Sequence, residues 1–497
     1  MTTTGFEHVE LRRGAYADSV ALLQVSKDVA AVDGVTAAQV AMATDLNRDV
    51  IAQMGFTLPE STPNDMIVAV RLDDEGTLPA ALEAVDAALA RASRRSDDGA
   101  SSEIEPPRTT LSAFDRTDAG LALVSVPGAS AAVEAADALD AGRDVMIFSD
   151  NVPVEHEIAL KQLATERGLL VMGPDCGTAV IDGIGLGFAN AVRPGPVGIV
   201  AASGTGCQQL LCLLDHAGVG VSAALGVGGR DLSEAVSALS TREAMRRLDE
   251  DASTELIVVV SKPPAAKVAE ELREYAATLT TPVQFALLGS GQPDLTTTAE
   301  AVLETLGRPV PEWPHRGETA QVEGGRLRGL FVGGTLCDEA MLIATDAVGD
   351  VYSNIPLEPR LELGADRRAD GTVMIDFGDD GMTAGRAHPM IDPTLRLEDL
   401  ARTARDGDAS VVLMDVVLGH GAEDDPAGSL APAISSAVET AKAGGRELAV
   451  VVACVGTQDD PQQTDRQAEA LAAVGAEVFL SNAQATRRAL SLIGAAR

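Results

Sequence analysis

Short, continuous apolar segments recur along the chain from residue 120 onward, and they constrain the fold more than any other feature. They include GLALVSV, PVGIVAA, ELIVVVS and ELAVVVACVG, and stretches of helical length with one apolar face separate them. Strands that are apolar throughout are covered on both faces, which is typical of parallel sheets flanked by helices. The sequence therefore predicts an α/β fold with doubly wound parallel sheets.

One polar stretch precedes this pattern and another interrupts it; both are rich in proline, glycine or charged residues, and we interpret residues 96–117 and 311–326 as linkers. A length of 497 residues suits three or four domains. The predicted domains are a small N-terminal α/β domain (1–95), a partial Rossmann-like domain (118–192), a first flavodoxin-like domain (193–310) and a second flavodoxin-like domain (327–497).

The charge of the chain argues against nucleic acids and anionic membranes as partners. Acidic residues number 74 and basic residues 38, which gives a formal net charge of -36, whereas nucleic-acid binding needs a cationic surface. No apolar segment is long enough to span a bilayer, and no secretion signal is visible, so we expect a cytoplasmic protein. The five cysteines show no CxxC spacing, so we expect no metal site.

Two strand–turn–helix segments resemble each other and carry the residues best suited to bind an anion. The turns are Ser203-Gly204-Thr205-Gly206 and Gly333-Gly334-Thr335, and each follows an apolar strand and opens a helix. Backbone amides at a helix start, together with the helix dipole, attract anions. A tight turn with a capping hydroxyl is the structural alternative. Taken as a pair, the two turns predict a phosphate site.

Longer motifs carry a resemblance to a known family. MGPDCGTAVIDG, VGIVAASGTG and ALGVGGRD resemble the α subunit of succinyl-CoA synthetase and related NDP-forming acyl-CoA ligases, and GLFVGGTLCDEAM resembles the carboxyl-terminal domain of the β subunit. The joined arrangement, with SKPPA and AHPMIDPTLR, resembles the FdrA family. The resemblance implies that the partial Rossmann-like domain is of the CoA-binding type and that both turns grip one phosphate. CoA is the one cofactor that it suggests.

The chain also departs from the ligase pattern. Ligases of that superfamily carry a phosphohistidine in a loop after the strand written here as PVQFALL, but no histidine lies between His216 and His315. Only the second half of the CoA-binding domain is recognisable, and the chain has no ATP-grasp domain. We therefore do not expect this chain to ligate CoA with a nucleotide on its own.

The resemblance to FdrA implies one activity in particular. It suggests a subunit of a multi-subunit oxamate carbamoyltransferase, which converts oxalurate and phosphate into oxamate and carbamoyl phosphate. Such a reaction needs phosphate binding and oxyanion stabilisation but no phosphohistidine. The expected partners are these small anions and the other subunits. Two alternatives stay open, namely an acyl-CoA ligase subunit that receives the phosphohistidine in trans, and a non-catalytic subunit that senses an anion.

Other polar residues at predicted strand ends and loops complete the set of candidates. Imidazole groups serve as general acids or bases, so we name His388, with Arg386 beside it, and His420 as candidate catalytic residues, although a structural loop histidine is the alternative in each case. The candidates for a substrate or CoA-like site are Pro127, Gly128, Asp175, Lys262 and Asp376.

Overall fold

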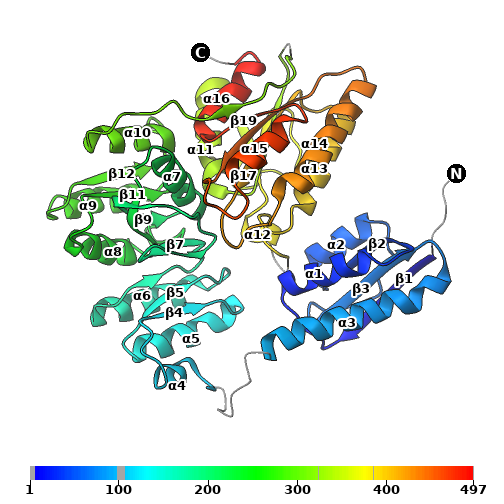
Figure 1. Ribbon diagram of the computed structural model, residues 1–497, viewed down its shortest axis with the longest axis horizontal. Helices are drawn as coiled ribbons and strands as arrows, with labels where there is room; N and C mark the ends of the chain where they lie inside the picture. Colours follow the sequence, from blue (N-terminus) through cyan, green and yellow to red (C-terminus); the bar gives the residue numbers. More distant parts are fainter. Residues whose placement is uncertain (1–5, 98–106, 323, 384–385, 496–497) are drawn as a thin grey trace. The chain divides into compact units, whose positions relative to one another are not determined.

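The computed structural model describes residues 6–97, 107–322, 324–383 and 386–495 (Figure 1). It forms two compact units, which we call the N-terminal unit (1–106 with 379–392) and the large unit (107–378 with 393–497). The predicted α/β class is confirmed, with helices packed on four sheets. In the described part of the chain, no helix is long and apolar enough to cross a membrane.

The N-terminal unit contains a three-stranded antiparallel sheet with the order β1-β3-β2 (Figure 1). Its elements are β1 (Phe6–Arg13), α1 (Ser19–Ala30), β2 (Val35–Met42), α2 (Asp45–Gln53), β3 (Asp65–Leu72) and α3 (Leu78–Asp97). Residues of the central strand alternate between two cores, so that Val68 packs with α1 and α3 while Ile67 packs with residues of α2. The later segment 379–392 contributes the helix α12 (Asp380–Thr383).

The large unit begins with a small parallel sheet. Its elements are α4 (Thr110–Phe114), β4 (Leu121–Val124), α5 (Gly128–Asp140), β5 (Asp144–Ile147), α6 (Val154–Arg167) and β6 (Val171–Met172). The strand order is β4-β5-β6. Part of the predicted linker 96–117 therefore forms a short helix, while residues 98–106 lie outside the described residues.

A six-stranded sheet follows, with the order β12-β11-β9-β10-β7-β8. Its elements are β7 (Thr178–Ile181), β8 (Ile184–Gly187), β9 (Pro194–Ala202), α7 (Gly204–His216), β10 (Val221–Gly226), α8 (Leu239–Glu250), β11 (Leu256–Ser261), α9 (Ala266–Ala276), β12 (Val283–Leu287) and α10 (Leu295–Thr305). Four strands are parallel, but β7 and β8 form an antiparallel hairpin around Asp182 and Gly183, which both have positive φ.

The hairpin changes two expectations. We placed residues 178–187 in the Rossmann-like domain, yet β7 pairs with β10 of the next sheet. This sheet is therefore mixed where we expected a parallel one. The local sequence GTAVIDGIGLG indicates two short strands, but it does not indicate which sheet edge they join.

The seven-stranded sheet has the order β13-β19-β18-β17-β14-β16-β15 and is parallel except for β13. Its elements are β13 (His315–Arg316), β14 (Leu327–Phe331), α11 (Gly334–Val348), β15 (Val351–Ser353), β16 (Thr372–Asp376), α13 (Thr394–Asp406), β17 (Val411–Val417), α14 (Pro426–Ala443), β18 (Ala449–Val455), α15 (Thr464–Ala472), β19 (Ala476–Phe479) and α16 (Asn482–Leu492). Strand β13 lies inside the predicted linker 311–326, and β19 was not predicted. Trp313 of that linker is 5% exposed and donates to Glu300.

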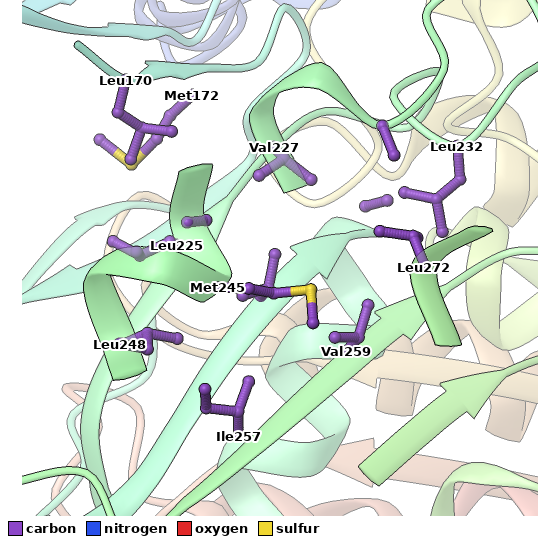
Figure 2. Packing of buried hydrophobic residues seen from close by; sticks show 14 of the residues in the cluster. Leu170, Met172, Leu225, Val227, Leu232, Met245, Leu248, Ile257, Val259 and Leu272 are labelled. Carbon is purple, nitrogen blue, oxygen red and sulfur yellow. The ribbon is translucent and has the colours of Figure 1, made fainter. Parts of the chain in front are cut away.

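The small parallel sheet and the six-stranded sheet share one hydrophobic core (Figure 2). Leu170 lies between α6 and β6, and Met172 belongs to β6. Both share a cluster with Met245 of α8 and with Ile257 and Val259 of β11. Fully buried Lys161 joins the same two regions, since its Nζ donates to Glu157 Oε1 at 2.7 Å and to Asp231 Oδ1 at 2.7 Å. Apolar packing and a buried ion network therefore hold these two sheets together.

Candidate functional site

The two glycine–threonine turns meet in the large unit. Strand β9 ends at Ala202 and α7 begins at Gly204, while β14 ends at Phe331 and α11 begins at Gly334. The Ser203 hydroxyl donates to Thr335 Oγ1 at 2.7 Å. Ser203 Oγ also accepts the Gly206 amide at 2.9 Å, so it caps α7. One serine therefore joins the starts of both helices.

Glycine is required where the two helices approach each other. A Cβ on Gly333 would lie 2.8 Å from Thr205 Oγ1, and a Cβ on Gly206 would lie 2.9 Å from Thr335 Cγ2. Neither distance leaves room for a methyl group. Gly204 differs, because its Cβ would lie 3.8 Å from the nearest atom, Thr178 Oγ1. A methyl group at the first residue of α7 would therefore make only ordinary van der Waals contacts.

Asp415 of β17, which sequence reasoning missed, holds the second turn. Its carboxylate accepts hydrogen bonds from the amides of Val332 and Gly333, both at 2.8 Å, and from Arg396 Nη1 at 3.2 Å. Burial raises the pKa of Asp415 to about 6, although Arg396 and the two amides oppose that shift. The Gly333 amide is thus already bonded, and the first amides left to meet a ligand are those of Gly334 and Thr335. Helix α11 has no side-chain cap.

Lys262 and Asp376 lie directly beside the start of α11. A Cβ on Gly334 would be 2.9 Å from Lys262 Nζ and 2.6 Å from Asp376 Oδ2. These side chains follow β11 and end β16, and therefore come from the carboxyl edges of two sheets. Burial opposes the charged form of Lys262, but Asp338, Asp376 and Asp175 outweigh it and raise its pKa, so the side chain is an ammonium ion.

The loop after β6 approaches the start of α7. Asp175 has a φ of 56° and donates its amide to the Ser149 carbonyl at 3.0 Å. A Cβ on Gly177 would lie 4.0 Å from Gly204 Cα. The structure therefore brings the two turns, Lys262, Asp376 and the Asp175 loop close together, while their roles stay predictions.

Pro127 and Gly128 stand at the start of α5, on the small parallel sheet. A Cβ on Gly128 would lie 2.2 Å from the Asp150 carbonyl, so this glycine allows two turns to pack. Helix α5 has no side-chain cap, and Val126 beside it is 37% exposed. The roles of Pro127 and Gly128 in a substrate or CoA-like site stay a prediction.

The structure places Arg386 and His388 in the N-terminal unit, not in the unit that carries the turns. Arg386 pairs with Asp392 at 3.2 Å, and both side chains are buried. Burial lowers the pKa of His388 to about 4, so its ring is neutral at physiological pH, and its Nδ1 accepts the Met390 amide at 3.3 Å. These contacts give both residues structural roles, and their catalytic roles stay a prediction.

His420 follows β17 and is exposed. Its amide donates to the Ala189 carbonyl at 2.8 Å, and Gly185 of β8 lies close to its ring. His420 thus contacts β8 and the residues that follow it, and its catalytic role stays a prediction. All five cysteines are buried.

Two parts of the chain match family models. Residues 1–106 match a family described as AllF, heavy metal-associated domain, and residues 330–492 match the CoA-ligase family. Residues 1–106 contain no cysteine, and their one histidine, His8, lies beside Glu10. Heavy metals prefer thiolate ligands, so this donor set does not fit such an ion. Among the described residues, no cluster of three or more acidic, histidine or cysteine side chains is arranged to hold a metal.

Whole-chain comparisons give both near and distant relatives. The α subunit 2 of succinate–CoA ligase from Archaeoglobus fulgidus is 29% identical over 154 residues, which cover 30% of this chain and 52% of that one. The α-2 subunit from Trichomonas vaginalis is 30% identical over 152 residues, covering 30% and 48%. The chain thus spans about half the length of these ligase subunits. Among solved structures, ATP citrate lyase from Methanothrix soehngenii is 16% identical, with a TM-score of 0.32 over 41% of this chain and 38% of that one, a likeness that carries no conclusion.

The protein YahF of Escherichia coli is 39% identical over 498 residues. The match covers 94% of this chain and 95% of YahF, so it includes the N-terminal unit as well as the large unit. A likeness of this length and identity identifies a family, and this chain therefore belongs to the family of YahF.

Proposed function

We propose that this chain is a subunit of an enzyme of the NDP-forming acyl-CoA ligase type, and that it holds an acyl phosphate between the starts of α7 and α11. The observation that carries the proposal is the hydrogen bond between Ser203 and Thr335, which brings two helix starts to one place. The match of residues 330–492 to the CoA-ligase family supports it. So does the likeness to succinate–CoA ligase α subunits.

The phosphate would be bound by backbone amides and by one cation. Gly204 and Thr205 begin α7, Gly334 and Thr335 begin α11, and both helices are long enough to have a substantial dipole. Lys262 is the ammonium group beside Gly334. Its positive charge would offset the negative charges of the phosphate, Asp376 and Asp175. In the reaction, the acyl group passes from phosphate to the thiol of CoA, which gives a thioester and inorganic phosphate.

The phosphoryl carrier of the ligases is not in its expected place. The loop after β12 reads Gly-Ser-Gly-Gln-Pro-Asp, and no histidine lies between His216 and His315. We therefore propose that another subunit forms the acyl phosphate with a nucleoside triphosphate. This chain would then take part in the acyl transfer step.

The missing histidine also supports a second candidate, the carbamoyltransferase reaction of oxalurate with phosphate. That reaction makes an acyl phosphate analogue, carbamoyl phosphate, without ATP or CoA. It would use the same phosphate site. Carbamoyl phosphate formed from oxalurate and phosphate alone favours this candidate, whereas thioester formation from acetyl phosphate and CoA favours the ligase type.

Binding of acetyl phosphate to the full-length chain tests the shared part of both candidates. We expect saturable binding by calorimetry, weakened by about tenfold or more in Gly204→Val, since the side chain would fill the space in front of α7. Gly229→Val is the matched control, because a Cβ at Gly229 meets nothing within 4 Å. Absent binding in the natural chain, or equal binding in both variants, would refute the phosphate site.

A further inference from the structure

One buried carboxyl group beside the proposed phosphate site has no assigned role. Asp338 lies on α11 four residues after Gly334, so both residues face the same side of the helix. Its Oδ2 is 4.0 Å from Lys262 Nζ, the same atom that lies next to Gly334. Asp338 therefore lines the space at the start of α11.

The surroundings of Asp338 differ from those of the other carboxylates nearby. Asp376 accepts the Gly378 amide at 2.8 Å, and Asp415 accepts two amides, so both are held by short hydrogen bonds. Asp338 is 9% exposed, and Lys262, at a distance too long for a hydrogen bond, is the partner that the structure gives it. Its carboxyl group is thus free to take up and release a proton.

Burial and the ionisable groups around Asp338 set its charge state. Burial raises its pKa to about 6, and the ammonium group of Lys262 opposes the rise. Cys337, its neighbour on α11, is a protonated thiol because burial raises its pKa well above the ordinary value. Asp376 and Asp175 raise the pKa of Lys262 and so keep it positively charged. Both protonation states of Asp338 are therefore accessible close to neutral pH, as acid–base catalysis requires.

We propose that Asp338 is the general acid–base group of acyl transfer at this site, moving one proton between the phosphate and the atom that exchanges the acyl group. This inference rests on the proposed function. In the ligase direction, the thiol gives its proton to Asp338 while sulfur attacks the acyl carbon. The bond between that carbon and the phosphate oxygen then breaks, and Asp338 returns the proton to the phosphate, which leaves as hydrogen phosphate.

The same proton transfer serves the second candidate reaction. Hydrogen phosphate gives its proton to Asp338 while its oxygen attacks the carbamoyl carbon of oxalurate. The carbon–nitrogen bond breaks, and Asp338 passes the proton to the nitrogen, which leaves as the amide of oxamate. Atoms and charge balance in both reactions, and neither step as written uses an oxidant or a metal.

The first experiment measures proton uptake when acetyl phosphate binds to the full-length chain, by calorimetry in buffers of different ionisation enthalpy. A bound anion raises the pKa of a nearby carboxyl group. The natural chain should therefore take up protons on binding at about pH 6–7, and Asp338→Asn should lose most of that uptake. Equal uptake in both proteins would overturn the proposal without any need for turnover.

The second experiment follows thioester formation from acetyl phosphate and CoA as a function of pH. We expect Asp338→Asn to lower the rate by about 10²–10⁴-fold and to remove the pH dependence near pH 6, with partial rescue in Asp338→Glu. Asp346→Asn, an exposed change on the same helix, should match the natural chain. A full rate in Asp338→Asn would refute the acid–base role of Asp338 and leave the proposed function standing. Absent acetyl phosphate binding in the natural chain would refute the proposed function itself.

Discussion

The two helix starts at the candidate site share a sequence pattern but are held in different ways. Helix α7 is capped by its own Ser203, whose hydroxyl accepts the Gly206 amide. Helix α11 begins at Gly334, and its N-cap residue Gly333 has no side chain, so Asp415 of the neighbouring strand β17 accepts the Gly333 amide instead. A turn that is capped by its own side chain and a turn that is fixed by a residue of another strand can therefore look alike in sequence. The difference predicts unequal responses to mutation.

The largest effect is expected where the second turn depends on a distant residue. Asp415→Ala removes the acceptor of the Val332 and Gly333 amides and leaves Arg396, 3% exposed, without its carboxylate. Breaking a buried ion pair costs about 3–5 kcal/mol. We expect a loss of that size in the free energy of unfolding, measured with urea. A loss below about 1 kcal/mol would show that the second turn does not depend on β17.

The two equivalent glycines should differ by a smaller amount. Gly334→Ala would place a methyl group 2.6 Å from Asp376 Oδ2 and 2.9 Å from Lys262 Nζ, whereas Gly204→Ala has room. Overpacking of this kind costs about 1–3 kcal/mol, so Gly334→Ala should lower the stability and Gly204→Ala should not. Thermal unfolding of both variants checks this. Equal melting temperatures would contradict the asymmetry.

The smallest effect is expected at the bond that joins the two helices. Ser203→Ala removes a cap and the hydrogen bond to Thr335 Oγ1, which should cost about 0.5–2 kcal/mol. A double-mutant cycle with Thr335→Val isolates the bond between the helices, with an expected coupling of about 0.5–1.5 kcal/mol. A coupling of zero would mean that the two turns are positioned independently.

The sequence predicts the local parts of this molecule well. Apolar strands followed by small-residue turns indicate β9 with α7 and β14 with α11, because each such unit is encoded in about twenty consecutive residues. The sequence also predicts Lys262 and Asp376 as candidate site residues; the structure places both beside Gly334, and their roles stay a prediction. Both follow or end strands whose carboxyl edges come together.

The parts that were missed depend on pairing between distant segments. Strand β13 has two residues, and its place at the sheet edge is set by β19, more than 150 residues later. Asp415 accepts the amide of Gly333, which lies 82 residues earlier in the sequence. Its one local signal is a carboxylate inside an otherwise apolar strand, because such a group needs buried partners. Asp338 gives a similar signal, as an acidic residue on the buried side of a helix.

The segment 379–392 has a consequence for how this chain can be divided. It begins three residues after Asp376, the end of β16, and it belongs to the N-terminal unit. The chain returns to the large unit at Pro393, just before α13. Within the N-terminal unit, its Ala387 lines a small cavity together with Leu22 and Val40. A shortened protein that begins at residue 107 would therefore expose Ala387 and Met390, which are buried in the N-terminal unit, and we expect it to be prone to aggregate. In evolution, a simple exchange of the first 106 residues for another domain would meet the same obstacle, so the two units are expected to be inherited together.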